Sequence, residues 1–146
     1  MSRLRGAVLL GLALAGCNPT LTAQSVAPPG RTARLEPVHG FWTVKAYELE
    51  LSAGVASGVT CHEGGPCHDV AVTSDDPAIA EARPAAFGGL EPAGLGARAQ
   101  ATSLVIVGKT PGVTRMRLTS REGSRTIRVT VVAPPLYGTP TTAATR

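Results

Sequence analysis

The sequence predicts an all-β domain, either a sandwich or a barrel. Several short segments alternate apolar and polar residues with a period of two, which is typical of strands buried on one face. The 17 Gly and 12 Pro residues supply turns between these segments. Aromatic residues are only 3% of the chain and hydrophobic residues 43%, so the core must be largely aliphatic. No stretch of helical length has a clean amphipathic stripe, which disfavours a helical bundle.

The strand pattern recurs along the central part of the chain. The residues expected to face the core are, in chain order, Tyr47, Leu49, Leu51, Val70, Val72, Thr114, Met116, Leu118, Ile127, Val129 and Val131. Residues 104–107 form a continuous apolar run, which predicts a strand that is buried on both faces. Turn residues separate the segments at 76–77, 111–112 and 122–124.

Residues 1–16 have the organisation of a signal peptide. Arg3 and Arg5 form a positively charged start, and residues 7–15 form an apolar run that is too short to span a bilayer as a helix. The sequence therefore predicts that the chain is exported and that residues 1–16 are removed.

The end of this segment, Leu14-Ala15-Gly16-Cys17, resembles the lipobox of bacterial lipoproteins, in which an aliphatic residue and two small residues precede a cysteine. The resemblance implies cleavage between Gly16 and Cys17, a diacylglycerol on the Cys17 thiol and an acyl chain such as palmitate on the new amine. Two or more acyl chains anchor a protein stably to a membrane. In enteric bacteria an aspartate after the cysteine favours the inner membrane, so Asn18 favours the outer membrane. The alternative is a plain secretory signal with an unmodified Cys17.

Composition divides the exported chain into three parts. Residues 17–33 are small, polar and Pro-rich, which predicts a flexible tether that carries the lipid. Residues 134–146 are rich in Pro, Thr and Ala and predict a disordered tail. Residues 34–133 remain as one globular domain, which is large enough to bury its own core.

Three segments occur in the order found in bacterial immunoglobulin-like domains of group 2. Residues 72–80, VTSDDPAIA, resemble the strand and the Ser-Asp-Asp-Pro turn of that family, and residues 107–118, VGKTPGVTRMRL, resemble its Pro-Gly turn and Thr-rich strand. Residues 127–132 resemble its closing strand. The resemblance implies an immunoglobulin-like β-sandwich over the globular domain. Residues 83–102 and the cysteine-containing segment 61–67 depart from the family pattern.

The segment CHEGGPCH, residues 61–68, is the sharpest local feature. A disulfide between Cys61 and Cys67 is the preferred interpretation, because the Gly and Pro residues between them allow a tight turn. An exported chain meets an oxidising compartment, and these two cysteines form an even pair once the lipidated cysteine is set aside. One alternative is a Zn or Cu site formed by Cys61, His62, Cys67 and His68. The other is a free or redox-active thiol pair.

The remaining conspicuous residues are expected to be structural. Asp75 and Asp76 precede a proline and should form a turn by bonding their own backbone, and His39 should lie on the surface. Phe41 and Trp42 are expected to cover an edge of the core rather than to form a ligand platform. Arginines on the last two strand segments should form a solvated sheet face or contact lipid phosphates or an acidic partner. These arginines are Arg115, Arg117, Arg121, Arg125 and Arg128.

These features predict a membrane-anchored lipoprotein of the bacterial cell envelope with a structural or adhesive role. Its expected partners are the membrane, through the lipid, and an envelope protein or polymer. Removal of Arg3 and Arg5 with the signal peptide leaves 12 of the 14 Lys and Arg residues against 10 Asp and Glu. Together with export, this near balance argues against a nucleic-acid partner. No set of residues indicates catalysis, so we expect no enzyme activity and no cofactor; the alternative is a metal-binding periplasmic lipoprotein.

Overall fold

In the computed structural model, the described residues are 18–23, 27–85 and 102–134. They contain nine strands and no helix, which confirms the predicted all-β class. The strands are β1 Thr20–Ala23, β2 Ala33–His39, β3 Val44–Ser52, β4 Ala56–His62, β5 Ala71–Ser74, β6 Ala80–Ala85, β7 Thr102–Gly108, β8 Gly112–Ser120 and β9 Gly123–Val132. None of the described residues forms a helix long and apolar enough to cross a membrane.

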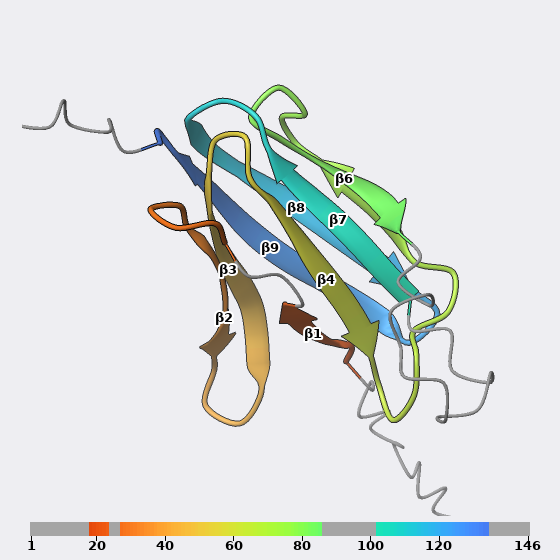
Figure 1. The fold of residues 1–146 in the computed structure, drawn as a ribbon. Coiled ribbons are helices and arrows are strands. Elements are labelled where there is room, and N and C mark those ends of the chain that lie inside the picture. Colours follow the sequence, from red (N-terminus) through yellow and green to blue (C-terminus); the bar gives the residue numbers. More distant parts are fainter. Residues whose placement is uncertain (1–17, 24–26, 86–101, 135–146) are drawn as a thin grey trace, which may run out of the picture.

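The strands form two sheets that lie face to face (Figure 1). The first sheet has the order β1-β4-β7-β6 and the second has the order β2-β3-β9-β8-β5. Neighbouring strands are antiparallel except β3 and β9, which run parallel. Immunoglobulin-type sandwiches combine an A-B-E-D sheet with a C-F-G sheet. Here β1, β4, β7 and β6 take the A-B-E-D places, and β5, β8 and β9 take the C-F-G places. The predicted immunoglobulin-like sandwich is therefore confirmed, with β3 and β2 as two additional strands beside β9.

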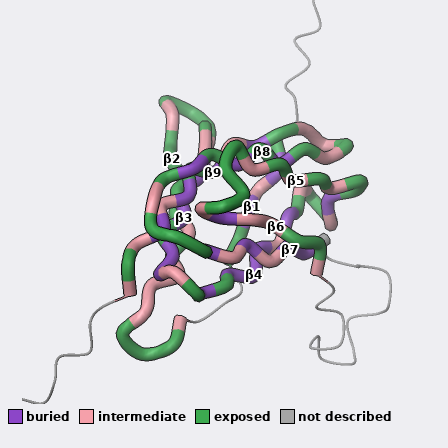
Figure 2. The backbone as a smooth tube through the Cα atoms, turned by 90° about the horizontal axis from the view of Figure 1, so that it is seen from above, coloured by how far each residue is buried: buried purple, intermediate pink, exposed green. Residues whose placement is uncertain are grey.

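The core lies between the sheets and follows the predicted alternation on β3, β8 and β9. Their inward side chains are buried and pack against buried residues of β4 and β7. In Figure 2 the buried residues lie along the strands, whereas the connections are largely exposed. Of the described residues, Tyr47 is the only aromatic one in this core, as the low aromatic content predicted. The largest buried side chains of the second sheet are Tyr47, Leu49, Leu51, Met116, Leu118 and Ile127.

Strand β7 differs from the prediction of a strand buried on both faces. Leu104 and Ile106 are buried, but Val105 and Val107 are only half-buried. The strand is central, between β4 and β6, yet no further layer of described residues covers the outer face of its sheet. The continuous apolar run thus forms a strand with one face in the core and the other face partly exposed to solvent.

The predicted tether is also wrong over Thr20–Ala23, which forms β1 and pairs with β4. Leu21 is buried, and its backbone N–H donates to the Tyr47 hydroxyl at 2.9 Å. The carbonyl of Pro19 accepts a hydrogen bond from Arg125 Nε at 2.7 Å. The strand is therefore held by partners remote in sequence. The predicted signal peptide, Cys17 and the tail beyond Pro134 lie outside the described residues.

Candidate functional site at the N-terminal end of the sandwich

One end of the sandwich brings together most of the features that the sequence singled out. Because β3 runs parallel to β9, the β2–β3 turn, residues 40–43, lies at the same end as the β8–β9 turn, residues 121–122. The pairing of Thr20 with His62 places the start of β1 beside the β4–β5 connection, residues 63–70. That connection contacts the β8–β9 turn. We call this the N-terminal end; it is the lower end of the molecule in Figure 1.

A disulfide closes the start of the β4–β5 connection, which confirms the predicted pairing of Cys61 with Cys67. The sulfur atoms are 2.00 Å apart and the Cα atoms 5.5 Å apart. Gly64 has a φ of 64°, a left-handed conformation that glycine adopts without steric cost. The backbone N–H of Cys67 donates to the Cys61 carbonyl at 3.2 Å. Both cysteines are buried and belong to the core, so the disulfide joins the connection to the sandwich interior.

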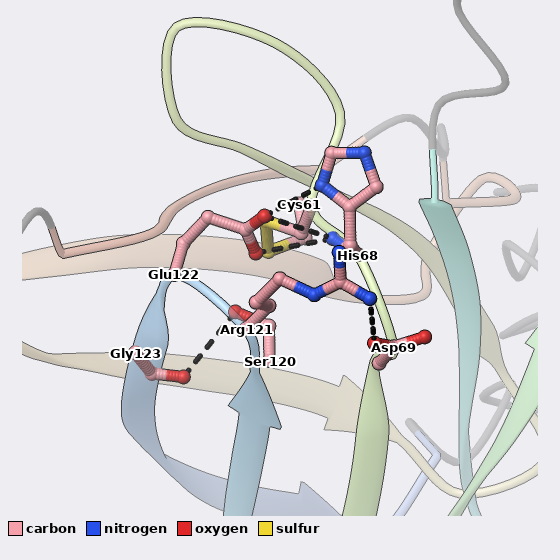
Figure 3. Close-up of polar contacts among 8 residues, drawn as sticks. Cys61, His68, Asp69, Ser120, Arg121, Glu122 and Gly123 are labelled. Carbon is pink, nitrogen blue, oxygen red and sulfur yellow. Dashed lines mark hydrogen bonds and ion pairs between the residues drawn. A yellow bond between two sulfur atoms is a disulfide. The ribbon is translucent and has the colours of Figure 1, made fainter.

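Glu122 fastens the other half of this connection to the β8–β9 turn (Figure 3). Its two carboxylate oxygens accept the backbone N–H of His68 at 3.0 and 3.2 Å, and one of them lies 2.7 Å from His68 Nδ1. The hydrogen bond with the His68 ring, followed by that with its backbone, lowers the pKa of Glu122 to about 2. The carboxylate is therefore ionised at any physiological pH. Sequence patterns gave no signal for Glu122, because a turn residue has no periodicity to reveal it.

An ion pair forms a second contact between the β4–β5 connection and the β8–β9 turn. Arg121 lies 2.6 Å from an oxygen of Asp69, and the hydrogen bond with that carboxylate raises the pKa of Arg121. The backbone N–H of Arg121 also donates to the His68 carbonyl at 3.0 Å. Asp69 has a φ of 53°, a conformation that Asp tolerates better than most residues. The pair is exposed on both sides, so it positions the connection more than it stabilises the fold.

These residues do not assemble the alternative Zn or Cu site. Cys61 and Cys67 are bonded to each other, so neither provides the thiolate that such a metal binds. His68 is engaged by Glu122, and His62 is exposed at the end of β4. In the part of the chain that the structure describes, no group of three or more His, Cys, Asp or Glu could hold a metal ion. The disulfide also overturns the interpretation as a free thiol pair.

The prediction that the aromatic pair covers an edge of the core is wrong. Phe41 and Trp42 occupy the β2–β3 turn and are 88% and 87% exposed. Their rings contact each other edge to face, with centroids 4.9 Å apart and planes at 89°. The prediction failed because β2 and β3 extend as a hairpin whose tip lies away from the core.

Apart from Arg121, which lies in the β8–β9 turn, the predicted arginines divide into two groups. Arg115, Arg117 and Arg128 are exposed on the outer face of the second sheet, as predicted. Arg125 is instead 8% exposed and bonds the Pro19 carbonyl, so it helps to hold β1 in place. The sequence contained that signal, because Arg125 shares the phase of the inward residues of β9.

Two further predictions concern turn and surface residues. His39 is exposed at the end of β2, as expected. Asp76 forms the predicted turn, since its Oδ1 accepts the backbone N–H of Ala78 at 2.9 Å. Asp76 lies in the β5–β6 connection, at the opposite end of the sandwich.

Fold and site together define the class: an immunoglobulin-like sandwich with a disulfide-closed connection at one end. No protein-family model matches the chain, and no curated protein matches it. Solved structures that are similar to it include two of an S-layer protein. One contains domains 4 and 5 of the S-layer protein SbsC, with a TM-score of 0.42, 18% identity, and coverage of 80% of this chain and 54% of that one. The other contains domains 5–6 of the S-layer protein SbsC, with a TM-score of 0.38, 17% identity, and coverage of 79% and 45%. The chain thus spans about half the length of these structures, and likenesses this distant carry no conclusion about function.

Proposed function

We propose that the chain is an exported bacterial lipoprotein that is anchored in the cell envelope by acyl chains on Cys17. The observation that carries the proposal is the pairing of its cysteines. The chain has three, and Cys61 and Cys67 form a disulfide. Cys17 remains as the third, at the end of the segment that resembles a lipobox. Disulfides persist in oxidising compartments, so the bonded pair supports export by an argument independent of the leader.

The anchored domain has a structural or adhesive role in this proposal, and its partners are the membrane and an envelope protein or polymer. Loops at the ends of sandwich domains carry function on an otherwise conservative scaffold. The N-terminal end combines exposed aromatic rings with charged side chains from two connections, which suits binding. We assign the protein no enzymatic activity and no cofactor, and we place it at the outer membrane on the basis of Asn18.

The proposal is tested by the mass and the membrane association of the protein purified from its own envelope. We expect loss of residues 1–16 and addition of a diacylglycerol and an amide-linked acyl chain at Cys17. Cys17→Ala should remove both modifications and abolish stable membrane association, because the acyl chains provide the anchoring energy.

The matched control is the double variant Cys61→Ser with Cys67→Ser, which removes the other two cysteines. It should still be cleaved and acylated at Cys17. An unmodified Cys17 in the wild-type protein, or full membrane association of Cys17→Ala, would contradict the proposal.

A further inference from the structure

Exposed apolar side chains gather on the β2–β3 hairpin. In the part of the chain that the structure describes, the large hydrophobic side chains with high exposure are Val38, Phe41, Trp42 and Val113. Three of these four lie on this hairpin, and the two at its tip are the most exposed of all, at 88% and 87%. Exposed apolar side chains that gather in one patch mark a protein or membrane interaction site, whereas single scattered ones are normal on any surface.

The hairpin holds the two rings in this exposed position. The backbone N–H of Gly40 donates to the Thr43 carbonyl at 2.7 Å, which closes the turn that carries the rings. The Lys45 side chain lies across Gly40, where a Cβ would collide with it. Phe41 and Trp42 pack on each other and not on the core. The tip is therefore a preformed apolar surface.

The tip lies at the same end of the sandwich as the proposed lipid attachment point. Asn18 follows Cys17 directly, so their Cα atoms are about 3.8 Å apart. Pro19 is fixed by Arg125, and Leu21 is fixed by the hydroxyl of Tyr47 on β3, the strand that begins at this hairpin. Acyl chains at Cys17 would thus hold the N-terminal end, and not a remote point on a long tether, against the bilayer.

The chemistry of the hairpin fits the interface of a lipid bilayer. Trp favours the region of the headgroups, where its ring is buried while its polar edge stays hydrated, and Phe is typical of the apolar face of segments that insert at the interface. Residues 37–47 contain Lys45 and His39 and no acidic residue. A lysine beside an inserted ring can extend its ammonium group to lipid phosphates.

We propose that Phe41 and Trp42 insert into the membrane interface and form a second contact beside the lipid anchor, which fixes the orientation of the sandwich on the membrane. This inference rests on the proposed function, because the anchor is what brings the tip to the bilayer. With two contacts, the opposite end of the domain faces away from the membrane.

Trp42 is the only tryptophan of the chain, so its fluorescence reports on the tip alone. The test uses the mature chain from Cys17, with that thiol coupled to a maleimide lipid in vesicles of phosphatidylethanolamine and phosphatidylglycerol. Cys61 and Cys67 are protected by their disulfide. We expect emission at shorter wavelength on coupling, quenching by lipids brominated on their acyl chains, and protection from aqueous iodide.

The matched control moves the reporter to the far end of the molecule. In the variant Trp42→Phe with Val113→Trp, the only tryptophan lies near the start of β8, at a site that is 51% exposed. Its emission should not shift on coupling, brominated lipids should not quench it, and iodide should quench it fully.

The outcomes separate this inference from the proposed function. If the protein from cells carries acyl chains on Cys17 but Trp42 stays open to iodide and insensitive to brominated lipids, the inserted tip is wrong and the anchor stands. If Cys17 is not acylated in cells, both are wrong. If isolated envelopes shield Trp42 but pure lipid vesicles do not, the tip binds an envelope protein or polymer and the lipid contact is wrong.

Discussion

The two ends of the sandwich are held together in different ways. At the end opposite to β1, which comprises residues 53–55, 75–79 and 109–111, the turns are joined by several backbone hydrogen bonds, to which the side chains of Lys109 and Thr110 add bonds to backbone carbonyls. Gly54 N–H donates to the Gly108 carbonyl at 2.8 Å, and Gly108 N–H donates to the Val55 carbonyl at 3.0 Å. At the N-terminal end, a disulfide and the side chains of Glu122 and Arg121 act beside one backbone hydrogen bond, from Arg121 to the His68 carbonyl.

The difference indicates which end of the sandwich tolerates changes of surface side chains with the smaller loss of stability. Hydrogen bonds between the backbones of two turns require those backbones to lie close together. Substitution of a small residue there by a larger one separates them. Connections held by side chains leave their outer residues free to change, because the sheets do not depend on them. The aromatic tip and the glycines of the disulfide loop lie at that second kind of end, which is the end we propose faces the membrane.

The largest effect is expected at a buried glycine of the opposite end, Gly108, which packs against backbone and core side chains. A Cβ at Gly108 would lie 3.2 Å from both Leu51 Cβ and Val131 Cγ1, and 3.3 Å from the carbonyl of Ser52. Gly108→Val adds two more methyl groups at this buried position, so the free energy of unfolding should fall by about 3 kcal/mol. Urea denaturation measures the change.

The matched glycine at the N-terminal end is Gly65 in the disulfide loop. A Cβ there would meet no atom within 4 Å. Gly65→Ala should therefore change the free energy of unfolding by less than about 0.5 kcal/mol. Equal losses in the two variants would show that the ends do not differ in packing as we describe.

The second effect concerns the disulfide at the N-terminal end. Cys61→Ser with Cys67→Ser should lower the free energy of unfolding by about 2 kcal/mol, because the unfolded chain is no longer constrained by this short loop. Hydrogen exchange should show local loosening as well. The amide of Cys67, bonded to the Cys61 carbonyl, should exchange faster, while the amide of Gly54 at the opposite end should change only with global stability.

Uniform acceleration at both ends would contradict a local role for the disulfide. Wild-type protein under reducing conditions is the control. It should match the double variant if the loss comes from the bond and not from the serines.

Much of this fold was predictable because its central strands are long and regular. The inward phases of β3, β8 and β9 alternate with positions that are mostly charged or Thr, and the disulfide follows from the spacing of two cysteines around glycines. Strand β1 was not predictable in this way. Its four residues contain one buried side chain, Leu21, and its partners Tyr47 and Arg125 are 26 and 106 residues away from the groups they bond.

The functional end shows the same limit. Phe41 and Trp42 carry no mark that separates a hairpin tip from a core edge, because β2 is largely exposed without a clear apolar phase and the buried phase of β3 begins only at Tyr47. Their exposure depends on how far the hairpin extends beyond the core. Local sequence therefore predicted the scaffold well and the projecting parts poorly.

The smallest effect is a pH dependence confined to the N-terminal end. The hydrogen bonds from His68 hold the pKa of Glu122 near 2, below the ordinary carboxyl value of about 4.3. The folded state thus favours the ionised carboxylate, so its contribution to stability is present above the ordinary value and is lost as pH falls from about 4.3 toward about 2. Glu122→Gln removes this contribution. Wild type and variant should differ most at neutral pH and converge through that window.

Glu81 provides the control at the other end of the sandwich, since its pKa is lowered by a hydrogen bond with Lys109 and then by one with Arg83. Glu122→Gln should speed hydrogen exchange of the His68 amide, which the carboxylate accepts, and Glu81→Gln should leave that amide unchanged. Both glutamates lie near the surface, so added salt should reduce each effect. If Glu81→Gln speeds hydrogen exchange of the His68 amide as much as Glu122→Gln does, each charge acts on the stability of the whole sandwich. The two ends would then not be stabilised independently.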